Sequence, residues 1–167
     1  MDIISETIKK MLLYFDGDVK RINHALKVYA FAKSIGELEG IPKEKLKILE
    51  AAAVLHDIGI KESEIKYSSS SAKYQQLEGP SAARAILKEF NLSKGFIDRI
   101  SYLIGNHHTY DKIDDVDFQI LIEADFLVNI FEDSIGEKQI KVIRKKYFKT
   151  ITGTRYLDSL YSIQPDL

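Results

Sequence analysis

Apolar side chains recur at helical spacing along nearly the whole chain, and this pattern most constrains the fold. The first such stripe consists of Ile4, Ile8, Met11, Leu12 and Phe15. Residues three and four positions apart share one face of an α-helix, whereas a half-buried strand alternates with a period of two. Strand-like alternation is weak in this sequence. We therefore predict an all-α fold, a single compact helical bundle over residues 1–167.

Turn-forming residues divide the predicted helices. Asp16-Gly17-Asp18, with Asp18 as a cap, and Gly40-Ile41-Pro42 separate the first three helices, and Gly59 ends the third. Further helices are predicted over about 80–90, from a cap at Ser93, over 116–131 and over 137–148, followed by a tail rich in Tyr and Leu. The polar stretches 60–75 and 107–115 lack apolar periodicity, so we interpret them as long loops, which often carry binding residues.

Composition excludes several classes of function. Hydrophobic residues make up 45% and charged residues 29%, as in soluble globular domains. The net charge of −1, without a long basic block, argues against nucleic-acid binding. Without cysteine there is no disulfide, thiolate metal site or cysteine nucleophile. No apolar run is long enough to cross a membrane and no signal segment begins the chain, so we expect a cytoplasmic location.

The dipeptide His56-Asp57 ends the apolar run 51–55 and stands before Ile58-Gly59. Upstream, His24 lies on another amphipathic segment, and Asp125 interrupts an apolar run downstream. A carboxylate among apolar residues is costly if it faces the core without compensation. A metal would compensate Asp125, and so would Arg21 or a helix N-terminus. In a chain without cysteine, imidazole and carboxylate groups must supply the ligands of any such metal.

The order of three elements resembles the HD-domain metal-dependent phosphohydrolases. They are Arg-x-x-His (Arg21 to His24), Leu-His-Asp-Ile-Gly (55–59) and Ala-Asp-Phe-Leu (124–127), and the resemblance covers about 19–131, leaving a C-terminal helix and tail over 137–167. It implies a helical bundle in which one divalent metal is bound by His24, His56, Asp57 and Asp125. Two imidazoles and two carboxylates would leave an octahedral ion room for water and a phosphate oxygen. They suit Mn, Fe, Co, Ni or Zn better than Mg.

His107 and His108 resemble an element that holds a second metal in some members of this family. Another position at which many members have His reads Gln75-Gln76 here. Since Gln is a poor ligand for transition metals, we expect one metal, with a second less favoured. His107 and His108 would then line the pocket and donate to phosphate or shuttle a proton. The alternative is a polar loop at a helix end.

Three further charged residues are assigned to the site. Glu78 would handle protons near the metal water, or would only complement a helix dipole. Lys61, one position beyond the usual place of a lysine in this family, is assigned to phosphate binding. Arg21 would clamp a phosphate or pair with an acid. Catalysis is thus assigned to Asp57, Glu78, His107 and His108, and substrate binding to Arg21 and Lys61.

The predicted function is hydrolysis of a phosphoester in a small phosphorylated metabolite or nucleotide by a metal-activated water. Monoesters and diesters are not separated by the sequence. One alternative is a ligand-sensing or scaffold module that holds a metal without turnover. Another is a helical interaction domain without metal, in which His24, His56 and Asp125 would lie far apart. The C-terminal tail would pack back on the bundle or form a homodimer contact.

Overall fold

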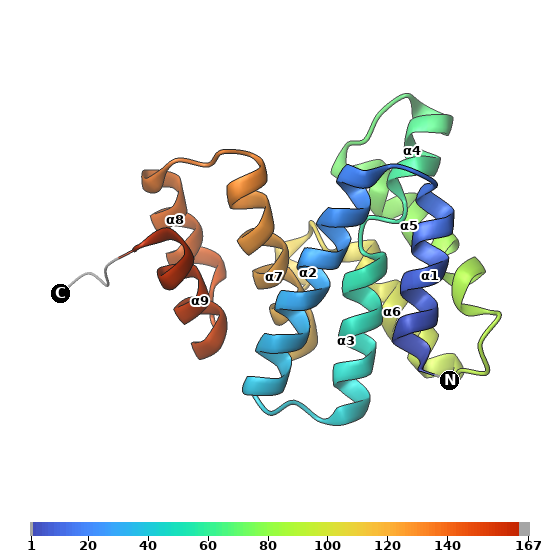
Figure 1. Cartoon of the computed structure of the whole chain (residues 1–167), viewed down its shortest axis with the longest axis horizontal. Helices are drawn as coiled ribbons and strands as arrows, with labels where there is room; N and C mark the ends of the chain where they lie inside the picture. Colours follow the sequence, from blue (N-terminus) through green and yellow to red (C-terminus); the bar gives the residue numbers. More distant parts are fainter. Residues whose placement is uncertain (1, 164–167) are drawn as a thin grey trace.

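The computed structural model describes residues 2–163, and in this part of the chain every regular element is helical (Figure 1). The all-α prediction is therefore confirmed. The elements are α1 Ile3–Phe15, α2 Val19–Leu38, α3 Lys43–Leu55, α4 Ile60–Tyr67, α5 Ala72–Leu87, α6 Lys94–Asn106, the 3-10 helix η1 Tyr110–Lys112, α7 Val116–Glu132, α8 Glu137–Tyr147 and α9 Ile151–Tyr161. None of the helices within residues 2–163 combines the length and the apolar character that crossing a bilayer requires.

Helices α2, α3 and α7 pack against one another in the middle of the bundle (Figure 1). Helix α7 is apolar on nearly all sides, as expected of a helix enclosed by others. Its residues Phe118, Ile120 and Leu121 are fully buried. Helices α8 and α9 form one end of the molecule, and α4 and α5 lie toward the other. The predicted metal ligands lie on these central helices or directly after α3, and the core fixes the positions of these helices.

Two predicted caps are present. Asp18 accepts a hydrogen bond from the backbone N–H of Arg21 at 3.2 Å, and Ser93 accepts one from that of Phe96 at 3.2 Å. Each satisfies a backbone donor in the first turn of its helix. Gly17 has a φ of +85°, a conformation that side chains rarely adopt, which explains a glycine at the sharp α1–α2 turn.

The prediction of a long loop over 60–75 is wrong. Helix α4 occupies Ile60–Tyr67, and α5 begins at Ala72 rather than near Pro80, which lies inside α5. The apolar signal is weak because α4 buries little more than Ile60 and Ser63. Tertiary packing holds α4 in place: a Cβ on Gly59 would lie 2.6 Å from the backbone nitrogen of Gly79 in α5. Such a close helix contact is not visible in apolar periodicity.

The tail packs back on the bundle as helix α9. The Tyr156 hydroxyl lies 2.6 Å from Ser34 Oγ on α2, and the Tyr161 hydroxyl donates to the Leu127 carbonyl at 2.6 Å. A buried carboxylate, Glu123 on α7, accepts the backbone N–H of Thr150 at 2.9 Å and the Thr150 hydroxyl. Glu123 therefore fixes the start of α9 against α7.

Candidate metal centre

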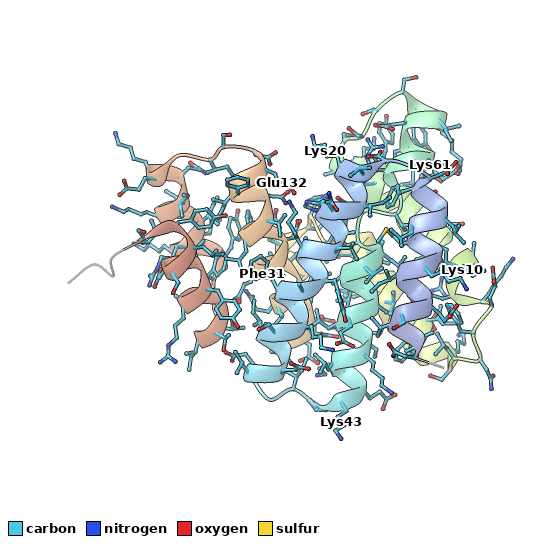
Figure 2. All side chains as sticks on the ribbon, in the orientation of Figure 1. Lys10, Lys20, Phe31, Lys43, Lys61 and Glu132 are labelled. Carbon is cyan, nitrogen blue, oxygen red and sulfur yellow. The ribbon has the colours of Figure 1, made fainter. Side chains whose placement is uncertain are left out.

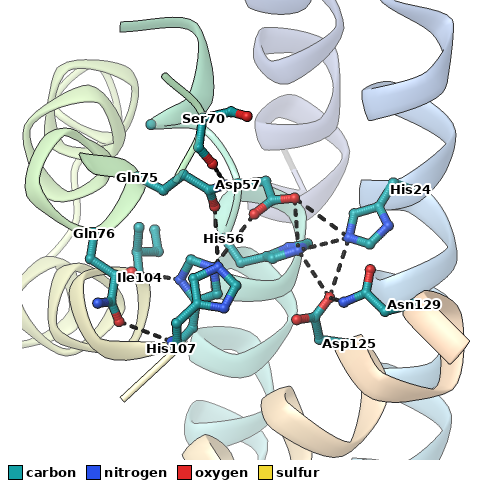
Figure 3. Close-up of polar contacts among 12 residues, drawn as sticks. His24, His56, Asp57, Ser70, Gln75, Gln76, Ile104, His107, Asp125 and Asn129 are labelled. Carbon is teal, nitrogen blue, oxygen red and sulfur yellow. Dashed lines mark hydrogen bonds and ion pairs between the residues drawn. The ribbon is translucent and has the colours of Figure 1, made fainter. Parts of the chain in front are cut away.

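The predicted ligands His24, His56, Asp57 and Asp125 converge from α2, the end of α3 and α7 (Figure 3). His24 Nε2 lies 3.1 Å from His56 Nε2, 3.3 Å from Asp125 Oδ1 and 3.5 Å from Asp57 Oδ2. His56 Nε2 lies 3.5 Å from Asp57 Oδ2 and 3.6 Å from Asp125 Oδ1. The interaction-domain alternative required these side chains to lie far apart, so its expectation is wrong.

The end of helix α3 positions the His-Asp pair. Helix α3 ends at Leu55, and His56 follows as its cap. The Nδ1–H of His56 donates to the Ala53 carbonyl at 2.8 Å, one of the carbonyls that a helix C-terminus leaves without a helical partner. Leu55 and Ile58 are fully buried on either side. This anchoring directs His56 Nε2 and the Asp57 carboxylate toward α2 and α7.

The cluster contains acceptors that face one another. His24 Nδ1 is bonded to Glu132 Oε2 at 2.7 Å, and His56 Nδ1 to Ala53, so each ring uses its N–H outward. When both imidazoles are neutral, each has one N–H, and both Nε2 atoms then present lone pairs to each other and to two carboxylates. With Zn–N bonds of roughly 2.0–2.1 Å, neighbouring ligand atoms lie about 3 Å apart. The residues present thus fit a divalent cation.

The electrostatics of the cluster also favour positive charge. Burial lowers the pKa of His56, but Asp57 and Asp125 outweigh this and raise it to about 9. Burial raises the pKa of Asp125, but hydrogen bonds and charges from His24 and His56 hold it well below its usual value. These shifts mean that the site attracts either protons or a cation, since two buried carboxylates need compensation.

His107 and His108 follow the end of α6 and lie beside Asp57. The Nδ1–H of His107 donates to the Ile104 carbonyl at 2.7 Å. Its buried Nε2 has no hydrogen-bond partner among the described residues and lies 3.4 Å from Asp57 Oδ1. Asp57, His107 and His108 thus form a second group of donors, on the other oxygen of Asp57. Burial, followed by the charge of His107, lowers the pKa of His108 to about 4.

Gln75 and Gln76 hold His108 by hydrogen bonds. Gln75 Nε2 donates to the Ser70 carbonyl at 2.6 Å, which turns its Oε1 toward His108 Nε2 at 3.2 Å. His108 Nε2 must then carry the proton, so this nitrogen is not available to ligate a metal. Gln76 Oε1 accepts the backbone N–H of His108 at 2.9 Å. The expectation of one metal stays a prediction, since Asp57, His107 and His108 form a second candidate group.

Arg21 lines the cavity above the cluster but is already paired with acids. Its guanidinium donates to Asp18 at 2.9 Å and to both carboxylate oxygens of Glu64, at 2.5 and 3.1 Å. The cavity measures about 530 Å³ and has His24 and Asp57 in its lining. Of the two roles predicted for Arg21, pairing with an acid is the one seen here.

Glu78 and Lys61 are not brought to the cluster. Glu78 accepts from Lys66 at 2.6 Å and from the Tyr67 hydroxyl at 2.9 Å, and it lines a different cavity beside Tyr14. Lys61 donates to the Tyr14 carbonyl at 2.8 Å. Because 60–67 is a helix rather than a loop, Lys61 is held against α1, and Glu78 on α5 is held by Lys66 and Tyr67 of α4.

The sequence reading missed Asn129 and Glu132. Asn129 donates to Asp125 Oδ1 at 2.8 Å, and Glu132 bonds to His24. Both line the cavity. They stand four and seven positions after Asp125. Since residues at this spacing share a helix face, the spacing from Asp125 was a signal that could have identified them.

Comparisons with known proteins agree with this geometry. The model of the HD domain matches residues 21–142. Among solved structures, the chain is similar to a predicted HD superfamily hydrolase from an uncultured Thermotogales bacterium, with a TM-score of 0.69 and 22% identity, covering 95% of this chain and 84% of that one. At this identity the likeness shows the fold alone. No curated protein matched. Because the domain model spans most of the chain, the protein belongs to the HD-domain family.

Proposed function

We propose that this protein hydrolyses a phosphoester of a small phosphorylated metabolite or nucleotide with the help of one divalent transition metal. The observation that carries the proposal is the convergence of the Nε2 atoms of His24 and His56, which lie 3.1 Å apart. They face two carboxylates beside an open cavity of about 530 Å³. Membership of a family of metal-dependent hydrolases supports the same reaction class.

The proposed ligands are His24, His56, Asp57 and Asp125, and Mn, Fe, Co, Ni and Zn suit them. Such an ion, when bound, lowers the pKa of a coordinated water and offsets the negative charge of a phosphate. Asn129 orients Asp125 through a hydrogen bond to Oδ1 at 2.8 Å. Ligands held in this way lose less entropy when they bind.

Two cations of the cavity, and the histidines beside Asp57, would bind and orient the substrate. Lys20 and Arg21 line one side, where a phosphate would find positive charge. Arg21 binds two oxygens of Glu64, a geometry that a phosphate reproduces, so substrate would exchange with Glu64. His107, with Nε2 directed at Asp57 Oδ1, would donate to the substrate or move a proton, with His108 beside it.

One observation favours the alternative of a sensing or scaffold module. The cation best placed for phosphate, Arg21, is already bonded to Asp18 and Glu64, and Glu78 and Lys61 point elsewhere. A module that binds a ligand without turnover needs no free acid or base at the cluster. Metal binding with ligand affinity but without hydrolysis would identify this case.

The direct test is a substrate screen of the metal-loaded protein. Apo protein would be loaded separately with Mn, Fe, Co, Ni or Zn and assayed against phosphomonoesters and phosphodiesters, including nucleotides. We expect hydrolysis with at least one ion. We expect its loss in Asp57→Ala, since the Asp57 carboxylate lies beside both His24 and His107. Equal background rates for wild type and Asp57→Ala with every ion and ester would reject the proposed enzymatic function.

A further inference from the structure

We infer that Glu132 is a positioning residue that fixes the tautomer and orientation of His24 and thereby sets the metal affinity of the centre. The inference rests on the proposed metal site. Glu132 is the last residue of α7 and lies between α7 and α2 (Figure 2). Its Oε2 is 2.7 Å from His24 Nδ1, and its Oε1 accepts from Lys27 Nζ at 2.5 Å.

His24 differs from His56 and His107 in where its outward bond goes. His56 and His107 follow directly after α3 and α6, and each donates through Nδ1 to a backbone carbonyl of the last helical turn. Those carbonyls are free to accept because a helix leaves its last four without a partner. His24 stands inside α2, where the neighbouring carbonyls accept helical N–H groups. A side chain must therefore supply the acceptor for His24.

Lys27 makes Glu132 a suitable acceptor. It lies three positions after His24, so both side chains leave the same face of α2 toward the end of α7. The ammonium group holds one carboxylate oxygen and leaves the other for the imidazole. An ionised carboxylate only accepts, so the proton of this bond resides on His24 Nδ1.

The consequence is a preset lone pair. With Nδ1 protonated, His24 Nε2 is directed at His56, Asp57 and Asp125, all within 3.5 Å. Without Glu132, the ring can exchange its proton to Nε2 or rotate about its side-chain bonds, and each change removes a ligand. Partners of this kind typically alter metal affinity by about 10- to 100-fold.

The chain offers a matched control in the next residue. Asp133 lines the same cavity and carries the same charge, but it makes no bond to His24. Asp133→Asn therefore removes one negative charge from the cavity without changing the support of the imidazole. Glu132→Gln keeps the shape of the side chain and retains one oxygen that can accept from Nδ1–H, so it should rescue part of the effect of Glu132→Ala.

The test is a titration of metal-free wild type, Glu132→Ala, Glu132→Gln and Asp133→Asn with Co²⁺, without substrate, monitored by calorimetry and by the cobalt absorption spectrum. We expect Kd to rise about 10- to 100-fold in Glu132→Ala. We expect a smaller rise in Glu132→Gln and little change in Asp133→Asn. The spectrum of Glu132→Ala should shift, since loss of an imidazole nitrogen changes the ligand field.

Equal Co²⁺ affinities for Asp133→Asn and the two Glu132 variants would overturn the inference. Thermal unfolding of the metal-free proteins checks the fold, and if Glu132→Ala does not fold, the isosteric Glu132→Gln decides the comparison. Wild type that binds Co²⁺ but hydrolyses no ester would reject the proposed function and leave this inference standing. If wild type hydrolysed an ester and the variants bound Co²⁺ as tightly as wild type, the inference would be rejected and the proposed function would stand. If wild type bound no Co²⁺, the proposed function and the inference would both be rejected.

Discussion

His24 Nε2 and His56 Nε2 lie 3.1 Å apart, and both rings are bonded through Nδ1 to acceptors outside the cluster, so in their neutral forms both Nε2 atoms carry lone pairs. Two lone pairs at this distance repel unless a cation or an added proton lies between them. The contact therefore links the tautomers, which are set by Glu132 and Ala53, to the occupancy of the centre. The same cation or proton would compensate the two carboxylates that lie beside them in a largely buried site.

Metal binding should stabilise the fold through this contact. An ion at 100 times its Kd adds about 2.7 kcal/mol to the free energy of unfolding. We expect Co²⁺ or Mn²⁺ to raise the melting temperature of metal-free protein, and Asp125→Asn to remove most of that rise, because Asp125 faces both histidines. Differential scanning fluorimetry measures both. Glu78→Gln, a carboxylate change outside the cluster, should keep the full rise, and an equal loss in both variants would contradict the assignment.

Glu64→Gln should strengthen substrate binding. Glu64 holds the Arg21 guanidinium in the fork that a phosphate would use. An exposed ion pair of this kind contributes roughly 0.2–1 kcal/mol, so its loss should lower KM by up to about fivefold with kcat little changed. Steady-state kinetics on any accepted phosphoester provides the measurement. Glu62→Gln, on the same helix but near Lys66, should leave KM unchanged; a raised KM in Glu64→Gln would show that Glu64 serves the substrate instead.

The fold class and the ligand set could be predicted from the sequence because both produce recognisable local sequence patterns. Apolar residues at helical spacing identify helices, and His56 and Asp57 stand next to each other at the end of one of them. The four ligands were assigned through the family resemblance and do converge. Asp125 stood out because a carboxylate in an apolar helix needs compensation.

The errors concern residues whose positions depend on contacts between distant segments. Helix α4 packs closely against α5 at Gly59, Lys61 on α4 is bonded to the Tyr14 carbonyl, and Glu78 on α5 is bonded to Lys66 on α4. Glu132 acquires its role through His24, 108 positions earlier. Neither relationship is visible in local periodicity, although the helical spacing of Glu132 from Asp125 gave a partial signal.

Gly153→Ala should destabilise the α7–α9 contact. A Cβ on Gly153 would overlap Glu123 Oε2 and come within 2.7 Å of Thr150 Oγ1. Overpacking of this kind costs about 1–3 kcal/mol, and here it would also disturb the carboxylate that caps α9. Urea unfolding measures the loss. Gly95→Ala is the control, since nothing lies within 4 Å of its Cβ position, and it should be neutral or stabilising.

Tyr14→Phe should stabilise the protein, most strongly at alkaline pH. The Tyr14 hydroxyl is buried and has no hydrogen-bond partner among the described residues, so its removal should add about 1 kcal/mol. Burial, with the charges of Glu62 and Glu78, raises the pKa of Tyr14 to about 12 from 10.0. The unfolded chain thus releases this proton first, and stability present below pH 10 is lost as pH rises toward 12. Denaturant unfolding at pH 8 and pH 11 should show a larger gain for Tyr14→Phe at pH 11, and an equal gain at both would contradict the raised pKa.

Gln75→His should convert the centre from one bound ion to two. Gln75 Oε1 requires His108 Nε2 to carry a proton, because the Gln75 amide nitrogen is committed to Ser70. Replacing the amide with an imidazole removes that requirement and adds a ligand beside Asp57 Oδ1, His107 and His108, which already lie within ligand distance of one another. Elemental analysis after loading with Mn²⁺ or Fe²⁺ should show about one additional ion per chain relative to wild type, since nitrogen and carboxylate donors suit both metals. Gln76→His serves as the control, because Gln76 supports the backbone of His108 rather than its ring, and it should add no ion. If wild type already bound two ions, the hydrogen bond from His108 to Gln75 would have to break on loading, and the one-metal assignment would be wrong.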